Sequence, residues 1–506
     1  MWELIVSGMS MVFLPENLFW AAVGVAFGMM MGSIPGLTDT MAIALLMPFT
    51  FYLEPVAGIA MLMGLCKGGN FGGSIPAILF NIPGTPQAMV TRLDGYPLTK
   101  QGKSGKALKT ALFSSTIADS ISDLILIFLA APVAMIALKI GPPEYTSVVI
   151  FSLMVISTAA TDKPLRGMVA TGIGLLLGSV GTDPGMGTTR LIFGTMELAD
   201  GFSIMSLVIG MLAFSEILLQ MEKSLLAKLA GTGGSKLGAA VEPLQGASTK
   251  ADNRVSFREF KKIIPSIGRG TAIGACIGII PGIGTTVGSY LAYIASKRAS
   301  KTPERFGNGA LEGLAAAEAG NNAVNGPNLV PLVTLGIPGN LAAALILGGF
   351  MMKGLIPGPM FMKTDGDMLY ALFLLLLLSN VFALVFGLFF IKHVHHVTKV
   401  AKPYLFSGIV VFSVIGSYTY SASVFDVFVM IAFGLLGYVL TKCRINLPTV
   451  IVAYFLGPLL ETNLRQALAI SGRDWSVFVT RPISLGFLIF TVVAVAFLMR
   501  KRRALN

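Results

Sequence analysis

The stretch "GGSIPAILFNIPGTP" (Gly72–Pro86) combines helix-breaking and hydrogen-bonding residues inside an otherwise apolar segment. It holds three Pro and three Gly, together with a Ser, a Thr and an Asn. Because Pro removes a backbone donor and Gly destabilises a helix, we expect the helix to break here. A broken helix exposes free amides that suit an anion and free carbonyls that suit Na⁺. These residue types indicate a carboxylate-binding site built from amides and hydroxyls. Such a site binds the anion weakly enough to release it.

The triplet Ile-Pro-Gly occurs four times, in two ordered pairs. Ile34–Gly36 and Ile82–Gly84 stand 48 residues apart, and Ile280–Gly282 and Ile337–Gly339 stand 57 apart. One such triplet is weak evidence for anything. Two pairs in the same order predict that the chain contains an internal duplication.

The flanks of the triplets match as well. "GMMMGSIPGLTDT" (Gly28–Thr40) aligns without a gap with "GACIGIIPGIGTT" (Gly274–Thr286). "NFGGSIPAILFNIPG" (Asn70–Gly84) aligns without a gap with "NGPNLVPLVTLGIPG" (Asn325–Gly339). Polar residues therefore accompany the breaks at equivalent places in both halves, which simple helix kinking does not explain.

The candidate substrate ligands are the glycines, hydroxyls and side-chain amides at these four breaks. They are Ser33, Gly36, Thr38, Asn70, Gly73, Ser74, Asn81, Gly84, Thr85, Gly282, Thr285, Thr286, Asn322, Asn325, Asn328, Gly339 and Asn340. The Asn residues either bind the ligand or tie broken backbone ends together.

Three ionisable residues lie in the apolar segments near the breaks. Asp39 is a candidate for coordinating Na⁺ or carrying a proton, and it also suits a cap for a helix starting at Thr40. Glu318 is a candidate for ion coupling or gating, with a structural ion pair as the alternative. Lys67 pairs either with substrate or with one of these acids, unless it snorkels to the membrane surface.

The composition is that of a membrane protein. The 506 residues are 54% hydrophobic and only 12% charged, whereas charged residues make up about 25% of soluble domains. The strand-period alternation of a membrane β-barrel is absent, so helices must span the bilayer. We expect an all-α polytopic membrane protein of about a dozen segments, some broken or re-entrant. The three cysteines match no metal spacing.

The net charge of +12 comes from Lys and Arg in short loops, which argues against nucleic acid as a partner. The loop 91–109 carries five Lys or Arg, whereas the equivalent 340–367 carries two. Conversely, 297–305 carries four and its equivalent 48–55 carries none. Equivalent loops therefore take opposite charge bias, which predicts two inverted-topology repeats, 1–221 and 263–506, joined by a polar cytoplasmic linker, 222–262.

The same rule predicts which loops face the cytoplasm. The basic segments 392–402, 441–444 and 500–503 are predicted to be cytoplasmic, which places the C-terminus inside, and 416–423 and 461–475 are predicted to lie outside. The N-terminus lacks the features of a cleavable signal peptide. The first fourteen residues fit either an interfacial helix or a partial span.

Two other function classes are weighed against a transporter. A membrane-embedded enzyme needs a nucleophile with its base or paired acids, and all three histidines lie in one basic loop far from Ser74. A channel needs a continuous pore, usually with symmetry across subunits, whereas paired broken helices favour alternating access. No P-loop is present, which agrees with transport driven by an ion gradient.

At these motifs the sequence resembles the large membrane subunit of the tripartite tricarboxylate transporters. The resemblance covers nearly the whole chain and includes "EAGNNA", "PLVTLGIPG", "GPPEY" and "LLLGSVGTDP". It implies a permease of the prokaryotic inner membrane that imports a carboxylate such as citrate with Na⁺ or H⁺ and needs no other cofactor. It also implies two partners, a small four-helix membrane subunit and a periplasmic substrate-binding protein.

Two departures from the family pattern lie at the predicted site. The family often has small residues after the first Pro-Gly, where this chain has Thr38 and Asp39. The family commonly has a Tyr just before "GGS", where this chain reads "CKGGNFGGS". Both departures lie where substrate and ion selectivity would be set.

Overall fold

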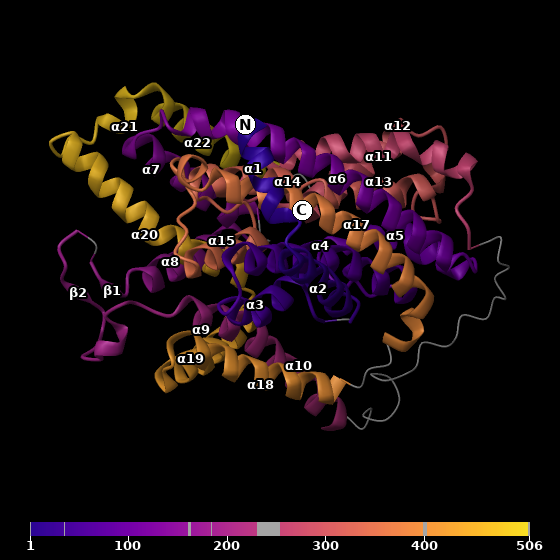
Figure 1. The fold of residues 1–506 in the computed structure, drawn as a ribbon, viewed down its shortest axis with the longest axis horizontal. Helices are drawn as coiled ribbons and strands as arrows, with labels where there is room; N and C mark the ends of the chain where they lie inside the picture. The colour runs from indigo at the N-terminus through magenta and orange to yellow at the C-terminus, as the bar shows by residue number, and fades with distance from the viewer. Residues whose placement is uncertain are drawn as a thin grey trace.

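The computed structural model describes residues 2–34, 36–159, 163–183, 185–229, 253–397 and 402–503. These residues form an all-α polytopic membrane protein, with β1 (Gly181–Thr182) and β2 (Thr189–Arg190) as a short antiparallel ribbon. Figure 1 shows this ribbon at the left of the view, below α20.

The helices follow one another closely along the chain. The first half contains α1 (Trp2–Val12), α2 (Pro15–Gly32), α3 (Asp39–Thr50), α4 (Pro55–Phe80), α5 (Ala88–Lys100), α6 (Ser104–Ala137), α7 (Pro142–Ala159), α8 (Pro164–Gly178), the 3₁₀ turn η1 (Met196–Leu198), α9 (Ile204–Val208), the π-helical turn η2 (Ile209–Phe214) and α10 (Ser215–Leu229). The second half contains α11 (Phe257–Gly278), α12 (Gly284–Ala299), the 3₁₀ turn η3 (Pro303–Arg305), α13 (Leu311–Asn322), α14 (Asn325–Leu335), α15 (Leu341–Met352), α16 (Phe361–Thr364), α17 (Gly366–Val397), α18 (Lys402–Ser421), α19 (Val424–Lys442), α20 (Leu447–Ile470), α21 (Val477–Thr480) and α22 (Pro482–Arg503).

Several helices have the length and composition of membrane spans. Within the described ranges, five helices are long and apolar enough to cross a bilayer, or six if the bent pair α1 and α2 forms one span. These two helices meet at an angle of 78°. Shorter apolar helices, among them α3, α8 and α15, accompany them. The total of about a dozen segments stays a prediction.

The chain breaks at the four Ile-Pro-Gly triplets, with matching backbone geometry in the two halves. Gly36 and Gly282 occupy the left-handed region, with φ of 97° and 90°. At the second break of each half the helix ends in a left-handed residue, Asn81 with φ 59° and Gly336 with φ 64°. Both conformations suit Gly or Asn better than other residues.

The hydrogen bonds at the second breaks match as well. The amide of Ile82 donates to the carbonyl of Pro76 at 3.3 Å, and that of Ile337 donates to Pro331 at 3.2 Å. These four residues occupy equivalent positions in the sequence alignment of the two halves. The same local sequence therefore produces the same helix end twice.

Glycines allow close helix packing at equivalent positions in the two halves. On α2 and α4, a side chain at Gly24, Gly28 or Gly32 would overlap the carbonyl oxygens of Met61, Leu65 and Gly69. On α11 and the pair α13–α14, the equivalent Gly270, Gly274 and Gly278 pack against the carbonyls of Ala316, Gly320 and Val324. Glycine is required at these seams because the two backbones touch.

One end of the molecule gathers segments that the charge pattern predicts to be cytoplasmic. Asp94 on α5 accepts three hydrogen bonds of 2.8–2.9 Å from backbone amides within 307–310. Lys106 at the start of α6 pairs with Glu259 on α11 at 2.8 Å. The basic loops of both halves therefore meet, although the membrane orientation itself stays a prediction.

Segments predicted to lie outside also contact one another. Lys353, after α15, donates to the carbonyl of Phe51, after α3, at 2.8 Å. Arg190 on β2 forms a bidentate pair with Glu461 on α20 at 2.7 and 3.0 Å. The β ribbon and the end of α20 therefore belong to the same end of the molecule.

The predicted linker 222–262 is partly helical. α10 continues to Leu229, and α11 begins at Phe257 behind a capping box made by Ser256 and Glu259. Residues 230–252 of this segment lie outside the described residues. The boundaries of the two repeats stay predictions.

Candidate functional site

Residues from the breaks of both halves line one cavity of about 660 Å³. This volume lies in the range of small-molecule sites, about 300–1,000 Å³. Nine of the residues predicted from the sequence line it: Thr38, Asp39, Asn70, Gly282, Thr285, Thr286, Asn325, Gly339 and Asn340. The breaks therefore converge on one site, which we call the main cavity.

The first break places an acid on the wall of the main cavity. Thr38 is the N-cap of α3, and its hydroxyl accepts from the amide of Met41 at 3.2 Å. Asp39 is the first residue of the helix and is buried against the backbone of Gly69 on α4. Its carboxylate accepts from the amide of Thr40 at 2.9 Å. The prediction that Asp39 caps a helix starting at Thr40 was wrong, because Thr38 takes that role.

The second half presents two helix N-termini to the main cavity. α12 begins at Gly284 without a side-chain cap, and Thr285 and Thr286 of its first turn line the cavity. α15 is capped by Asn340, whose side-chain oxygen accepts from the amide of Ala343 at 2.8 Å. Amides of a first turn lack partners inside the helix, so α12 can donate to an anion in this cavity.

Asn70 on α4 lines the main cavity and carries a buried hydrogen-bond donor. Its side-chain oxygen accepts from Gln87 at 2.8 Å, which orients the amide. Its Nδ2 has no hydrogen-bond partner within the described part of the chain, although the residue is only 1% exposed. A buried donor without a partner is costly, so this position suits a ligand acceptor.

The charged residues that line the main cavity are acidic. They are Asp39 and Glu216, and Glu216 accepts from Gln220 on the same helix at 2.7 Å. The described lining residues include no Lys, Arg or His. The cavity therefore combines neutral hydrogen-bond donors with two carboxylates.

Sequence reasoning missed part of the cavity wall. Glu216 follows the π-helical turn η2, and the start of α20 contributes Asn446 and Thr449. Single π turns inside α-helices often mark functional sites. The acid in an apolar segment was the signal that could have identified Glu216.

The other predicted site residues do not line the main cavity. They are Ser33, Gly36, Gly73, Ser74, Asn81, Gly84, Thr85, Asn322 and Asn328, together with Glu318. Gly84 packs against Gly32 and Gly73, and its amide donates to the carbonyl of Gly73 at 3.1 Å. Asn81 is exposed at the end of α4. Asn81 and Gly84, at the second break of the first half, therefore form the turn that packs back on Gly73 of α4, and these three residues do not line the cavity.

Glu318 lies in a buried hydroxyl cluster. Ser74 and Thr91 donate to its Oε1 at 2.7 and 2.5 Å, and Ser115 donates to its Oε2 at 2.8 Å. The side-chain amide of Asn322 donates in turn to Ser115 at 2.9 Å. The cluster therefore connects α4, α5 and α6 of the first half to α13 of the second.

Lys67 pairs with two acids that the sequence analysis did not single out. Its Nζ lies 2.7 Å from Asp119 Oδ1 and 2.7 Å from Asp123 Oδ2, and all three side chains are buried. We call these residues the charged triad. The predicted pairing with Asp39 or Glu318 is therefore wrong. The spacing of the two acids, four apart in an apolar helix, was the signal that could have identified them.

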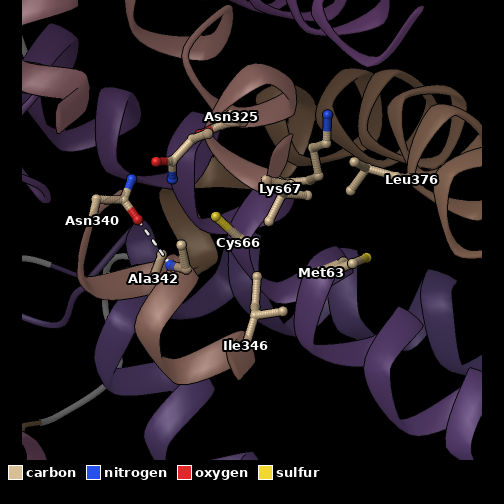
Figure 2. Close-up of a pocket in the computed structure, with 11 residues that line it drawn as sticks. Met63, Cys66, Lys67, Asn325, Asn340, Ala342, Ile346 and Leu376 are labelled. Atoms are coloured by element: carbon tan, nitrogen blue, oxygen red, sulfur yellow. Dashed lines mark hydrogen bonds between the residues drawn. The ribbon is translucent and has the colours of Figure 1, made fainter. Parts of the chain in front are cut away.

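A second, small pocket of about 20 Å³ lies beside the triad. Lys67, Asn325, Asn328 and Asn340 are its polar lining residues, and Cys66 is among the others. Figure 2 shows Asn325 and Asn340 on one side of Cys66 and the Lys67 side chain on the other. A polar pocket of this size can hold one water molecule.

With this geometry, comparison with known proteins becomes informative. A family model described as the tripartite tricarboxylate transporter TctA family matches residues 18–452. The chain belongs to this family. Membership identifies it as a subunit of a tricarboxylate transporter, and the tripartite organisation implies further subunits.

Two proteins of Agrobacterium vitis are similar to the chain. One is an uncharacterized 52.8 kDa protein in the TAR-I ttuC′ 3′ region, 35% identical over 94% of this chain and 91% of that protein. The other is an uncharacterized protein in the TAR-II ttuC′ 3′ region, 36% identical over 44% of this chain and 92% of that protein. No solved structure matches the chain.

Proposed function

We propose that the chain is the permease of a secondary transporter that imports a tricarboxylate-like anion across the prokaryotic inner membrane, driven by a Na⁺ or H⁺ gradient. A periplasmic binding protein delivers the substrate, and a small four-helix membrane subunit completes the complex. The observation that carries this proposal is the main cavity, where breaks from both halves meet around neutral donors and acids.

The donors suit carboxylate oxygens. The first-turn amides of α12, the hydroxyls of Thr285 and Thr286, and the amide of Asn70 line one cavity. Neutral donors hold an anion without the strong pairing that an Arg or Lys would impose. Such a site can release its substrate on the other side of the membrane, as transport requires.

The acids suit a coupling cation. Asp39 and Glu216 give the main cavity a negative potential that repels a bare polyanion. A cation at Asp39 reduces this repulsion, so anion and cation favour each other's binding. This reciprocity is the basis of symport. It makes Asp39 the first candidate for the coupling site, whereas Glu318 lies outside the cavity.

The matched breaks and glycine seams support two inverted repeats that provide alternating access. The main cavity is also lined by Thr441, which precedes Lys442, and Lys442 pairs with Glu222 at the end predicted to be cytoplasmic. The cavity therefore reaches a segment predicted to be cytoplasmic, which would suit release of substrate to that side.

Carboxylate uptake into liposomes tests the proposal. The chain is reconstituted with its partner subunits, and Na⁺ and pH gradients are imposed separately on citrate and a panel of di- and tricarboxylates. We expect gradient-driven accumulation that Asp39→Asn abolishes, because the cation loses its counter-charge. Asp426→Asn, which changes a buried acid at the start of α19 outside both cavities, is the matched control. Accumulation that Asp39→Asn leaves unchanged would remove Asp39 from coupling, and single-channel currents in electrical recordings would indicate a channel.

A further inference from the structure

The charged triad contains more negative than positive charge. Lys67 on α4 contributes one ammonium, whereas Asp119 and Asp123 on α6 contribute two carboxylates. The exposed fractions of the three side chains are 2%, 5% and 0%. When all three groups are ionised, one net negative charge is buried, which is costly unless a cation joins it.

The two carboxylates differ in how fully they are paired. Lys67 Nζ donates to both carboxylate oxygens of Asp123, at 2.9 and 2.7 Å, and Asn380 of α17 donates to Asp123 Oδ2 at 2.7 Å. Lys67 Nζ and the Asn325 amide of α14 contact Oδ1 of Asp119 at 2.7 and 3.4 Å, and the hydroxyl of Ser122, which donates to the Asp119 carbonyl at 2.8 Å, also interacts with this carboxyl group. Asp119 is therefore the carboxylate better placed to take up a further cation.

The small pocket links this place to the main cavity. Lys67 and Asn328 line the small pocket alone, whereas Cys66, Asn325 and Asn340 line both cavities. Asn325 also contacts Asp119. One water molecule in the small pocket would thus lie between residues that also line the main cavity and Lys67 of the triad.

Among the described residues, Lys67 is the basic side chain that pairs with Asp119 and Asp123. Among the titratable groups on these helices, Asp39 on α3 and Cys66 on α4 interact electrostatically with the triad region, and Glu318 on α13 and Tyr370 on α17 contact α6. The basic residues Lys106 and Lys109 lie in the first two turns of α6, ten or more residues before Asp119. The described parts of α14 and α15 contain no charged residue, and α2 carries one only at its first turn, Glu16. Lys67 is therefore the positive group that the triad itself provides.

We infer that the charged triad is a proton-binding site of the transport cycle, with Asp119 as the carboxylate that takes up the proton. This inference rests on the proposed function. The proton arrives by way of the small pocket, two of whose lining residues, Lys67 and Asn325, contact Asp119. One O–H bond forms on the Asp119 carboxylate as one in a protonated water breaks. The triad then changes from one net negative charge to zero, and the contact between α4 and α6 loosens.

Two assays on the same liposomes separate this inference from the proposed function. The chain is reconstituted with its partner subunits, with equal Na⁺ on both sides and radiolabelled citrate or another carboxylate of the panel. Exchange at equilibrium reports substrate binding and movement. Net accumulation under an imposed pH gradient reports proton coupling, since one proton per cycle changes the accumulation ratio about tenfold for each pH unit.

We expect wild-type protein to show both activities. Asp119→Asn imitates the protonated state, so it should retain exchange and lose the response to the pH gradient. Asp119→Glu restores a titratable group and should regain the response. Asp426→Asn, a buried acid at the start of α19 outside both cavities, is the matched control and should behave as wild type.

The possible results discriminate clearly. Two results would overturn the proton site and leave the proposed function intact. One is that Asp119→Asn responds to the pH gradient as the wild-type protein does. The other is that the wild-type protein accumulates substrate with Na⁺ but does not respond to the pH gradient. A wild type that exchanges no carboxylate would refute the proposed function itself. If Asp119→Asn fails to insert, a pH dye in weakly buffered wild-type liposomes decides the question, because coupling requires proton uptake with the carboxylate.

Discussion

The amide of Gly282 donates a hydrogen bond of 2.7 Å to the carbonyl of Gly339, which ties the two breaks of the second half directly together. Both glycines line the main cavity. Gly282 has φ 90° and packs against Ile156 of α7, so its position admits no side chain. The wall of the cavity is therefore built from backbone that two breaks hold in place.

Gly339→Val should disturb the site while leaving the protein in the membrane. The new side chain would overlap Oδ1 of Asn328, a movable group that lines the small pocket. Overpacking of this kind costs about 1–3 kcal/mol, which corresponds to a loss of about five- to hundredfold in apparent affinity. Carboxylate uptake per inserted protein measures the effect. Gly172→Val on α8, where a Cβ meets nothing within 4 Å, should transport normally.

Gly84→Val should act on folding. Its side chain would overlap the carbonyl oxygen of Gly32 and the backbone of Gly73, neither of which can move away cheaply. We expect a lower yield of folded protein and a lower midpoint of thermal denaturation in detergent, measured by size-exclusion chromatography after heating. A variant with wild-type stability but no uptake would instead place Gly84 at the substrate site.

Asn70→Leu should weaken substrate binding. The change removes the buried Nδ2 donor on the cavity wall. A hydrogen bond to a charged group contributes about 1.5–3 kcal/mol, so the apparent KM for the carboxylate should rise by about ten- to hundredfold. Initial uptake rates over a range of substrate concentrations measure this shift. Asn308→Ala, on an exposed loop, is the control, and an unchanged KM in Asn70→Leu would remove Asn70 from the site.

Glu318→Gln should lower stability more than coupling. Three hydroxyl donors converge on this carboxylate, and an amide nitrogen cannot accept their hydrogen bonds. The free energy of unfolding should fall by about 1.5–3 kcal/mol, seen as a lower denaturation midpoint, with an unchanged dependence of uptake on Na⁺ and pH. The opposite result, an unchanged midpoint with altered cation dependence, would place Glu318 on the ion pathway.

Thiol labelling tests the predicted orientation. Cys443 is exposed at the end of α19, in a segment predicted to be cytoplasmic. With Cys66 and Cys276 replaced by Ala, a membrane-impermeant maleimide should label Cys443 in inside-out vesicles and spare it in intact cells. A Cys-free parent carrying Asp474→Cys, at an exposed position predicted to lie outside, should show the reverse. Labelling of both positions from one side would invalidate the charge-based orientation.

The sequence by itself determined the helical membrane class and the positions of the breaks. Both depend on local physics, because long apolar runs must form helices in lipid and Ile-Pro-Gly interrupts a helix wherever it occurs. The matched conformations of Asn81 and Gly336 follow from the same local rules. The family could be recognised for the same reason, since its motifs surround these breaks.

The tertiary structure alone decided which break residues face the substrate and which pair with one another. Asn325 and Asn340 reach the main cavity, whereas Asn322 turns to Ser115. Lys67 pairs with acids 52 and 56 residues away in sequence, positions 119 and 123, because α4 packs against α6. Residues on a broken helix point in all directions, so the face that each presents depends on the neighbouring helices, and those contacts join segments far apart in the chain.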